Sequence, residues 1–306
     1  MTTILFVKTS SLGDVVHNCP AVSDAARAFP GAAIDWVVEE PFAGIAAMHP
    51  AVRRVIPVAV RRWRSALWKP ATWSAIGAWR RELRGERYDA IIDTQSLLKS
   101  ALITASALGR RHGLDRASAR ELLAPMFYDV RHSVPRGLHA VERNRLLAAK
   151  ALGFSLSTPP EYGLRVPAAS KSAYAVLLTM TSREDKLWPD ERWIALAHEL
   201  RMPTMLPWGS EGERERAQRI AAAVGGTTMP RRLGLDELAS LFVGAAAVVG
   251  LDTGLTHFAA ALGAPTVGVY CGSDPALTGI YGAPRATNIG APGRPPAVDE
   301  VVSLIS

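Results

Sequence analysis

The stretch ILFVKTSSLGDVVH, residues 4–17, decides the fold class, because an apolar run of strand length passes through a short polar loop into a helical pattern. A strand, a loop and a helix in this order near the start of a chain are typical of a parallel α/β protein with a phosphate-binding loop. This loop has one glycine, Gly13, where the dinucleotide fingerprint has three, and it carries the carboxylate of Asp14 where a phosphate would bind. The stretch therefore predicts an α/β fold and leaves the role of Asp14 open.

Apolar runs of strand length alternate with helical patterns along the whole chain, which is typical of parallel sheets covered by helices. We expect strands at 4–8, 34–39, 88–93, 174–180, 203–207, 245–250 and 265–270, and helices near 20–29, 74–84, 139–152, 190–200, 211–224, 235–243 and after Gly254. The stretch 154–172 has three prolines and scattered serines and is predicted to be a linker. A chain of 306 residues then divides into two domains, 1–160 and 161–306, with ligands at the carboxyl ends of their strands.

The composition, 48% hydrophobic and 21% charged, is that of an ordinary globular protein. Cys19 and Cys271 lie far apart and form no CxxC motif, so neither a disulfide framework nor a zinc site is predicted, and a reducing cytosol is the simplest compartment. The apolar run at 4–7 is too short for a secretory signal, and no run reaches the roughly 18 residues of a membrane-spanning helix. We expect a cytoplasmic protein.

Positive charge is concentrated in one segment. The whole chain carries +7, whereas residues 53–87 alone carry ten basic residues against Glu82 and Glu86 and contain four of the eight tryptophans. Such a basic, aromatic segment on a nearly neutral remainder predicts an anionic, partly apolar partner. Nucleic acid is disfavoured, because the chain contains no recognisable nucleic-acid-binding module.

Three polar loops each follow a predicted strand of the second half: TSREDKLWP (181–189), PWGSEGERERA (207–217) and LDTGLTH (251–257). Lys186 and the amides at a helix start beside Thr253 can bind phosphate, and an acid in the middle loop can accept hydrogen bonds from ribose hydroxyls. The alternative interpretation of these residues is structural: they are helix caps, solvated charges and acids that complement a helix dipole. Together the three loops predict a site for phosphate and ribose.

Asp14 also has two interpretations. It is either a helix cap or a general base that projects toward a substrate hydroxyl.

Several stretches, in this order, resemble the lipopolysaccharide heptosyltransferases of glycosyltransferase family 9: VKTSSLGDVVH (7–17), VEEPFAGIAAMHPAVRRVIPVAVRRWR (38–64), REDKLWP (183–189), LPWG (206–209) and LDTGLTHFAAALGAPTVGVY (251–270). The resemblance runs from Ile4 to about Gly282, and VIPVAVRRWR (55–64) favours the heptosyltransferase I branch. It implies a GT-B fold, in which two Rossmann-like domains face each other across a cleft. The first domain would bind the acceptor and the second the donor.

The resemblance implies an enzyme that transfers L-glycero-D-manno-heptose from ADP-heptose to the first Kdo (3-deoxy-octulosonate) of Kdo2-lipid A with inversion, without a metal or other cofactor. Such an enzyme would associate peripherally with the cytoplasmic face of the inner membrane of a Gram-negative cell. The alternatives are another enzyme of the family, such as a heptosyltransferase II, and a non-catalytic binder of acidic glycolipid.

The resemblance also implies roles for individual residues. Asp14 matches the catalytic base, Lys186 the lysine on the donor phosphates and Glu213 the glutamate on the adenosine ribose. The donor side comprises Ser11, Thr181, Ser182, Lys186, Glu213, Asp252, Thr253, Gly254, Leu255 and His257. The acceptor side comprises Arg61, Arg62, Arg64, Arg120, His139 and Arg143. GT-B chains often send a last helix back to the first domain, and residues 297–305 are long enough for part of such a helix.

Overall fold

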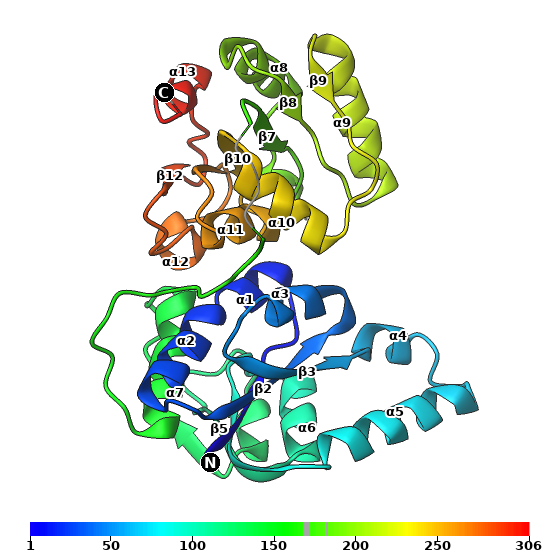
Figure 1. Ribbon diagram of the computed structural model, residues 1–306, viewed down its shortest axis with the longest axis vertical. Helices are drawn as coiled ribbons and strands as arrows, with labels where there is room; N and C mark the ends of the chain where they lie inside the picture. The colour runs from blue at the N-terminus through cyan, green and yellow to red at the C-terminus, as the bar shows by residue number, and fades with distance from the viewer. Residues whose placement is uncertain (168–171, 182, 306) are drawn as a thin grey trace. The chain divides into compact units, whose positions relative to one another are not determined.

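Each half of the chain forms its own parallel β-sheet in the computed structural model, which describes residues 1–167, 172–181 and 183–305 (Figure 1). The chain divides into unit 1, Met1–Leu164, and unit 2, Arg165–Ser306, four residues after the predicted boundary. Of the predicted linker 154–172, residues 168–171 lie outside the described residues. Its first part packs on unit 1, where Arg27 donates a hydrogen bond of 2.7 Å to the Thr158 hydroxyl.

The described part of unit 1 has a six-stranded sheet with the order β3-β2-β1-β4-β5-β6. Its strands are β1 (Thr3–Val7), β2 (Ala33–Glu39), β3 (Val52–Val58), β4 (Arg87–Asp93), β5 (Leu108–Leu114) and β6 (Val130–His132). Its helices are α1 (Leu12–Val16), α2 (Cys19–Ala28), α3 (Ala43–Ala47), α4 (Val60–Arg64), α5 (Pro70–Leu83), α6 (Leu98–Ser106) and α7 (Ala140–Leu152), with short 3₁₀ turns at Glu40–Phe42 and Ala124–Phe127.

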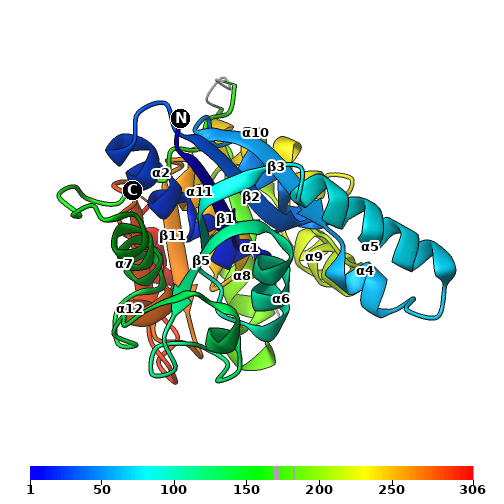
Figure 2. The same ribbon diagram turned by 90° about the horizontal axis from the view of Figure 1, so that it is seen from below.

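The central strands of unit 1 are apolar because helices cover both faces of the sheet. Residues 4–7 of β1 are fully buried, as expected for a parallel strand with no solvent-facing side. Helices α2 and α7 pack together on one face, and α5 and α6 lie on the other (Figure 2). Leu83 of α5 and Ile103 of α6 join the core formed by Leu5 and Val7.

The described part of unit 2 repeats this topology with the sheet order β12-β11-β10-β7-β8-β9. Its strands are β7 (Ala175–Leu178), β8 (Thr204–Met205), β9 (Thr227–Thr228), β10 (Ala247–Leu251), β11 (Thr266–Tyr270) and β12 (Ala286–Gly290). Its helices are α8 (Asp190–Glu199), α9 (Glu211–Ala223), α10 (Leu235–Gly244), α11 (Gly254–Ala261), α12 (Pro275–Thr278) and α13 (Val298–Val302), with a 3₁₀ turn at Glu184–Lys186.

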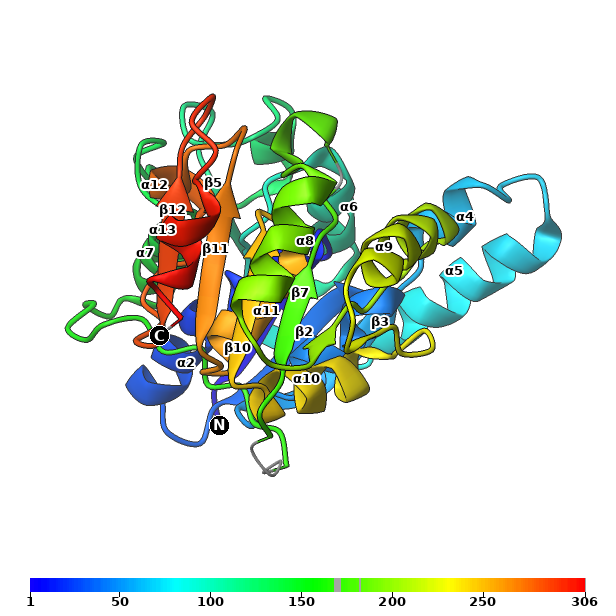
Figure 3. The same ribbon diagram turned by 90° about the horizontal axis from the view of Figure 1, so that it is seen from above.

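The last helix, α13, packs on unit 2. It lies beside α8 (Figure 3), and Val301 is buried in the same core as Trp188 and Trp193. The indole N–H of Trp188 also donates a hydrogen bond of 3.1 Å to the Pro296 carbonyl just before α13. Helix α13 therefore belongs to the core of unit 2, and the expected return of residues 297–305 toward the first domain stays a prediction.

The predicted α/β class is confirmed, and every strand predicted from an apolar run exists, with ends that shift by up to two residues. The prediction missed β3, β5, β6, β9 and β12. These strands are short or lie toward the edges of the sheets, where charged or polar residues interrupt the apolar pattern. Strand β5, for example, has the sequence LGRRHGL.

Both sheets place their candidate loops at a topological switch point, where ligands bind in open α/β sheets. In unit 1 the loops after β1 and β4 leave neighbouring strands from the carboxyl edge. In unit 2 the loops after β7 and β10 do the same. The strand order thus brings together residues that are 66 to 89 positions apart in the sequence.

Candidate functional site

The loop after β1 is held against the loop after β4 by one buried side chain, Gln95. Its Oε1 accepts hydrogen bonds from the Thr9 N–H (2.6 Å) and hydroxyl (2.8 Å) and from the Ser10 N–H (3.2 Å). Its Nε2 donates to the Ser10 carbonyl. Lys99 of α6 donates a further bond of 2.7 Å to the Ser10 hydroxyl. The loop that leads to Asp14 is therefore fixed before any ligand binds.

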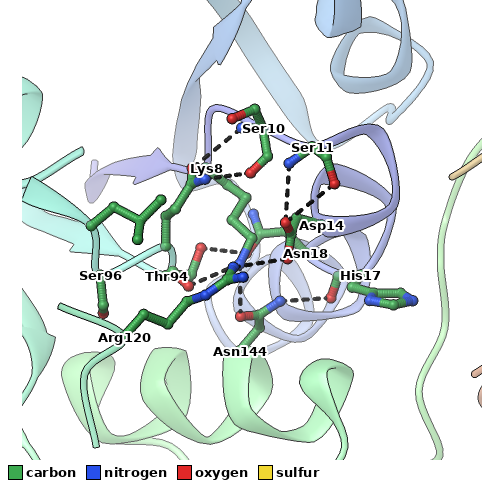
Figure 4. A network of polar contacts seen from close by, with 12 residues as sticks. Lys8, Ser10, Ser11, Asp14, His17, Asn18, Thr94, Ser96, Arg120 and Asn144 are labelled. Atoms are coloured by element: carbon green, nitrogen blue, oxygen red, sulfur yellow. Dashed lines mark hydrogen bonds and ion pairs between the residues drawn. The ribbon is translucent and has the colours of Figure 1, made fainter. Parts of the chain in front are cut away.

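Asp14 is the third residue of α1, and its side chain is 25% exposed (Figure 4). Its Oδ2 accepts hydrogen bonds from the Ser11 N–H (3.0 Å) and hydroxyl (3.3 Å), which makes it part of a capping box. Its Oδ1 lies 3.4 Å from Nη1 of Arg120. Asp14 is therefore a helix cap, but one that remains accessible and keeps an oxygen directed at a half-exposed arginine.

Nearby cations keep Asp14 ionised. Burial raises the pKa of this carboxyl, but Lys8, Arg120 and the hydrogen bonds from Ser11 together hold it below its ordinary value. Lys8 is itself buried beneath the loop, where its Nζ donates to the Thr94 carbonyl at 2.9 Å. Burial lowers the pKa of Lys8 to about 8, although Asp14 favours the charged amine.

Arg120 and Arg143 form a basic cluster beside Asp14. Arg143 donates a hydrogen bond of 2.6 Å to the Ser118 carbonyl, and burial followed by the charges of Arg120 and Arg136 lowers its pKa. His139 caps α7, where its Nδ1 accepts from the Val141 N–H at 3.2 Å. The arginines of this cluster repel one another, and a bound anion would stabilise their charged forms.

Arg61 and Arg64 of α4 line a pocket of about 480 Å³ together with Val60, Ser65 and Lys99. Lys99 was not among the site residues predicted from the sequence. Its hydrogen bond to the Ser10 hydroxyl links this pocket to the Asp14 loop. Arg62 points elsewhere, because it pairs with Glu40 at 2.7 Å. The pocket therefore offers three cations to one anionic group, and two of them were predicted for the acceptor.

Some of the basic residues of segment 53–87 are paired with carboxylates within unit 1. Arg53 and Arg54 belong to β3, and both guanidinium groups bind the fully buried carboxylate of Asp35 at 2.9 Å. Arg53 also pairs with Glu86. These two arginines are therefore neutralised within unit 1, and the positive surface begins at α4.

In unit 2 the side chain of Asp252 organises the loops after β7, β10 and β11. Its Oδ2 accepts hydrogen bonds from Lys186 Nζ at 2.6 Å and from the Ser273 hydroxyl at 2.5 Å. The Asp252 Oδ1 lies 3.4 Å from Nε2 of His257, and the backbone carbonyl of Asp252 accepts a hydrogen bond of 3.0 Å from the Thr181 hydroxyl. The structure thus joins four residues predicted for the donor, and adds Ser273.

The N-terminus of helix α11 directly follows Asp252 in the chain. Thr253 is the N-cap residue in an extended conformation, and Gly254 and Leu255 begin the helix, partly exposed. The N–H groups at a helix start have no partner within the helix and favour an anion. With the Lys186 ammonium beside them, they form a candidate phosphate site.

Glu213 is the third residue of α9, where its Oε2 accepts from the Gly209 N–H (2.6 Å) and the Ser210 N–H (3.3 Å). Within the described part of the chain its Oε1 accepts no hydrogen bond and is available to a ligand hydroxyl. No hydrogen bond of the described residues joins Glu213 to the Asp252 cluster. Ser182, also predicted for the donor, lies outside the described residues.

The Asp252 cluster makes the stability of unit 2 dependent on pH. Burial raises the pKa of this carboxyl, but His257, Lys186 and Ser273 outweigh burial and bring the pKa far below its ordinary value. A carboxylate with a depressed folded pKa stabilises the fold above its unfolded pKa of about 4 and loses that effect as pH falls. We expect Asp252→Asn to unfold at lower urea concentration than wild type at pH 7, and this difference to shrink toward pH 3. A constant difference would contradict the assignment.

No helix among the described residues is both apolar enough and long enough to cross a membrane. Within the same residues, no group of three or more His, Cys, Asp and Glu side chains is arranged to hold a metal ion.

Comparisons with known proteins agree with this geometry. The model of glycosyltransferase family 9 (heptosyltransferase) matches residues 76–301. The chain is 45% identical over 290 residues to lipopolysaccharide heptosyltransferase 1 of Escherichia coli K12, with 91% of each chain covered. It is similar to the structure of the E. coli heptosyltransferase WaaC with ADP, at a TM-score of 0.92 and 43% identity over 99% of each chain. The structure of WaaC with ADP-2-deoxy-2-fluoro heptose matches at a TM-score of 0.88 and 42% identity, again over 99% of each chain.

Proposed function

The chain belongs to glycosyltransferase family 9, the heptosyltransferases, and on this premise we propose that it transfers heptose from ADP-heptose to the first Kdo of Kdo2-lipid A. The enzyme is a glycosyltransferase of lipopolysaccharide core biosynthesis. The donor follows from the ADP and the ADP-sugar analogue bound to the similar E. coli protein. One observation carries the assignment of the reacting group: an accessible, ionised Asp14 is fixed at the switch point of unit 1.

Unit 2 binds the donor through its phosphates. Lys186 and the N–H groups at the start of α11 stabilise the charge that develops on ADP as the bond to the anomeric carbon breaks. Asp252 accepts a hydrogen bond of 2.6 Å from the Lys186 ammonium, so its carboxylate positions the lysine for the phosphates. Glu213, through its available Oε1, accepts hydrogen bonds from the ribose hydroxyls.

Asp14 of unit 1 accepts the proton of the attacking Kdo hydroxyl. The new bond forms on the face of the heptose ring opposite the departing ADP, so the anomeric configuration inverts. A carboxylate with a lowered pKa is a weak base. Proton transfer therefore occurs late, after the hydroxyl oxygen has begun to bond to an oxocarbenium-like carbon and has become acidic. The enzyme acts on its lipid acceptor at the cytoplasmic face of the inner membrane.

The proposal is tested by measuring ADP release from ADP-heptose with and without Kdo2-lipid A, together with the mass of the lipid product. We expect release to depend on the acceptor and the product to gain one heptose. Transfer only onto an acceptor that already carries one heptose would instead identify a second heptosyltransferase. Binding of the glycolipid with no ADP release would identify a non-catalytic protein.

The acceptor pocket gives a separate prediction. Arg61→Gln with Arg64→Gln should raise the KM for Kdo2-lipid A by roughly 10–100-fold, because hydrogen bonds to charged groups contribute about 1.5–3 kcal/mol. The KM for ADP-heptose should stay unchanged. Arg62→Gln should have a smaller effect, since this guanidinium is already paired with Glu40. Steady-state kinetics with each substrate varied in turn measure both constants, and equal effects on the two would contradict the assignment of the acceptor to this pocket.

A further inference from the structure

Helices α4 and α5 form an arm on unit 1, which we define as residues 60–83. In Figures 1 and 2 the two helices extend away from the sheet of unit 1, with the segment that connects them at the far end. The base of the arm is anchored, because Val60, Trp63 and Trp79 pack against the core that contains Leu83. Within the described part of the chain, no residue of the tip, residues 65–73, packs against this core.

The tip exposes three large apolar side chains. Leu67 is 45% exposed, Trp73 60% and Trp68 76%, the most of any tryptophan among the described residues. The turn beneath them is ordered: the Trp73 indole N–H donates to the Leu67 carbonyl at 2.8 Å, and the Thr72 hydroxyl donates to the Ala66 carbonyl at 2.8 Å. The two rings are therefore held outward by a hydrogen-bonded turn, although water is an unfavourable surrounding for them.

The same arm is strongly basic. Residues 60–83 contain one acid, Glu82, at the base of the arm, against six cations: Arg61, Arg62, Arg64, Lys69, Arg80 and Arg81. Among the described residues only Arg62 of these six has a carboxylate partner, Glu40. Unpaired cations around exposed aromatic rings suit a surface that is anionic outside and apolar just beneath.

We propose that the tip of the arm docks on a lipid bilayer that contains anionic phospholipids, with Leu67, Trp68 and Trp73 inserted at the boundary of head groups and acyl chains. Tryptophan favours this boundary, and each nearby cation adds attraction to anionic lipid. An acidic peptide would satisfy the cations but would leave the leucine and both rings without an apolar partner. Nucleic acid is disfavoured because the chain contains no recognisable nucleic-acid-binding module.

This inference deepens the proposed function, on which it rests, because it identifies the surface by which the enzyme approaches a lipid acceptor. Arg61 and Arg64 lie on the arm and line the pocket with Lys99, whose ammonium binds Ser10 in the Asp14 loop. An arm docked on the bilayer would bring this row of cations to the level of the lipid head groups. The sugar of an embedded acceptor would then meet the pocket without leaving the membrane.

The test compares the full chain with the variant Trp68→Ala/Trp73→Ala in flotation with vesicles of phosphatidylglycerol and phosphatidylcholine. Loss of both rings should weaken binding at least roughly tenfold, and phosphatidylcholine alone should bind neither protein well. In vesicles of brominated lipid, the tryptophan fluorescence of wild type should be quenched and that of the variant much less. Trp68→Ala alone, which removes no ring that supports the turn, should show part of both effects. Leu277→Ala/Leu304→Ala removes two apolar side chains of unit 2 that are 44% and 42% exposed, and this variant should bind like wild type.

Wild-type binding by the double tryptophan variant would overturn the proposal. So would binding that requires Kdo2-lipid A in the vesicle, because the arm would then hold the acyl chains of the acceptor and not the bilayer. A failure of the proposed reaction is detected separately, by ADP release with a deacylated, water-soluble Kdo2 acceptor. In that assay the tryptophan variants should keep wild-type turnover.

Discussion

Asp14→Asn should lower kcat by roughly 10²–10⁴-fold while the affinity for ADP-heptose stays nearly unchanged. The amide is almost isosteric with the carboxylate, and its oxygen can still accept the hydrogen bonds that the Ser11 N–H and hydroxyl donate at 3.0 and 3.3 Å. It cannot accept the proton of the acceptor hydroxyl. Single-turnover kinetics at saturating donor, with donor affinity measured by calorimetry, separate the two effects.

The structure supplies a matched control for the capping role of Asp14. Glu300 is also the third residue of a five-residue helix, and its Oε2 accepts from the N-cap N–H of Ala297 at 2.7 Å. Glu300→Gln, which keeps a hydrogen-bonding cap but removes its charge, should leave kcat unaltered. Asp14→Ala should lose the cap as well and cost about 1 kcal/mol of unfolding free energy. If Asp14→Asn keeps near wild-type turnover, Asp14 is a cap only and the base lies elsewhere.

Lys186→Met should lower kcat/KM for ADP-heptose by roughly 10²-fold, because it removes a charged hydrogen-bond donor from the phosphates. It should also destabilise unit 2, since Asp252 would lose a buried partner at 2.6 Å. Arg219→Gln, which removes an exposed cation from α9, should do neither. Kinetics and urea unfolding of the two variants measure both effects.

A double variant separates the two roles of Lys186. If the lysine only neutralises Asp252, then Lys186→Met/Asp252→Asn should recover donor affinity, because no uncompensated buried carboxylate remains. If the lysine binds the donor phosphates, the double variant should recover stability but bind ADP-heptose as weakly as Lys186→Met. We expect the second result, and recovery of donor affinity would refute the phosphate role.

Several candidate residues could be predicted because their signals are local. The apolar run before Lys8 predicts β1, the run before Asp252 predicts β10, and in a parallel sheet the polar residues after such runs must emerge at the carboxyl edge. Motif resemblance then predicts roles for Asp14 and Lys186, and these roles stay predictions. No local signal marked Ser273, Lys99 or the buried Lys8, which the sequence analysis treated only as the end of an apolar run. Each acquires its place from a partner distant in the sequence: Asp252, Ser10 and Thr94.

The α/β class, the two-part organisation and the family could be predicted from the sequence, because they depend on short-range periodicity and on motifs read in order. Which charges are available for ligands depends instead on the three-dimensional arrangement of the chain. The sequence does not distinguish the pair Arg53 and Arg54 from the pair Arg61 and Arg64. In the structure the first pair forms ion pairs with Asp35, whereas the second pair lines a pocket. Ion pairing depends on strand order and on the direction of each side chain, and neither is a property of neighbouring residues. For the same reason the structure alone shows that Asp14 caps its helix while its side chain stays partly exposed.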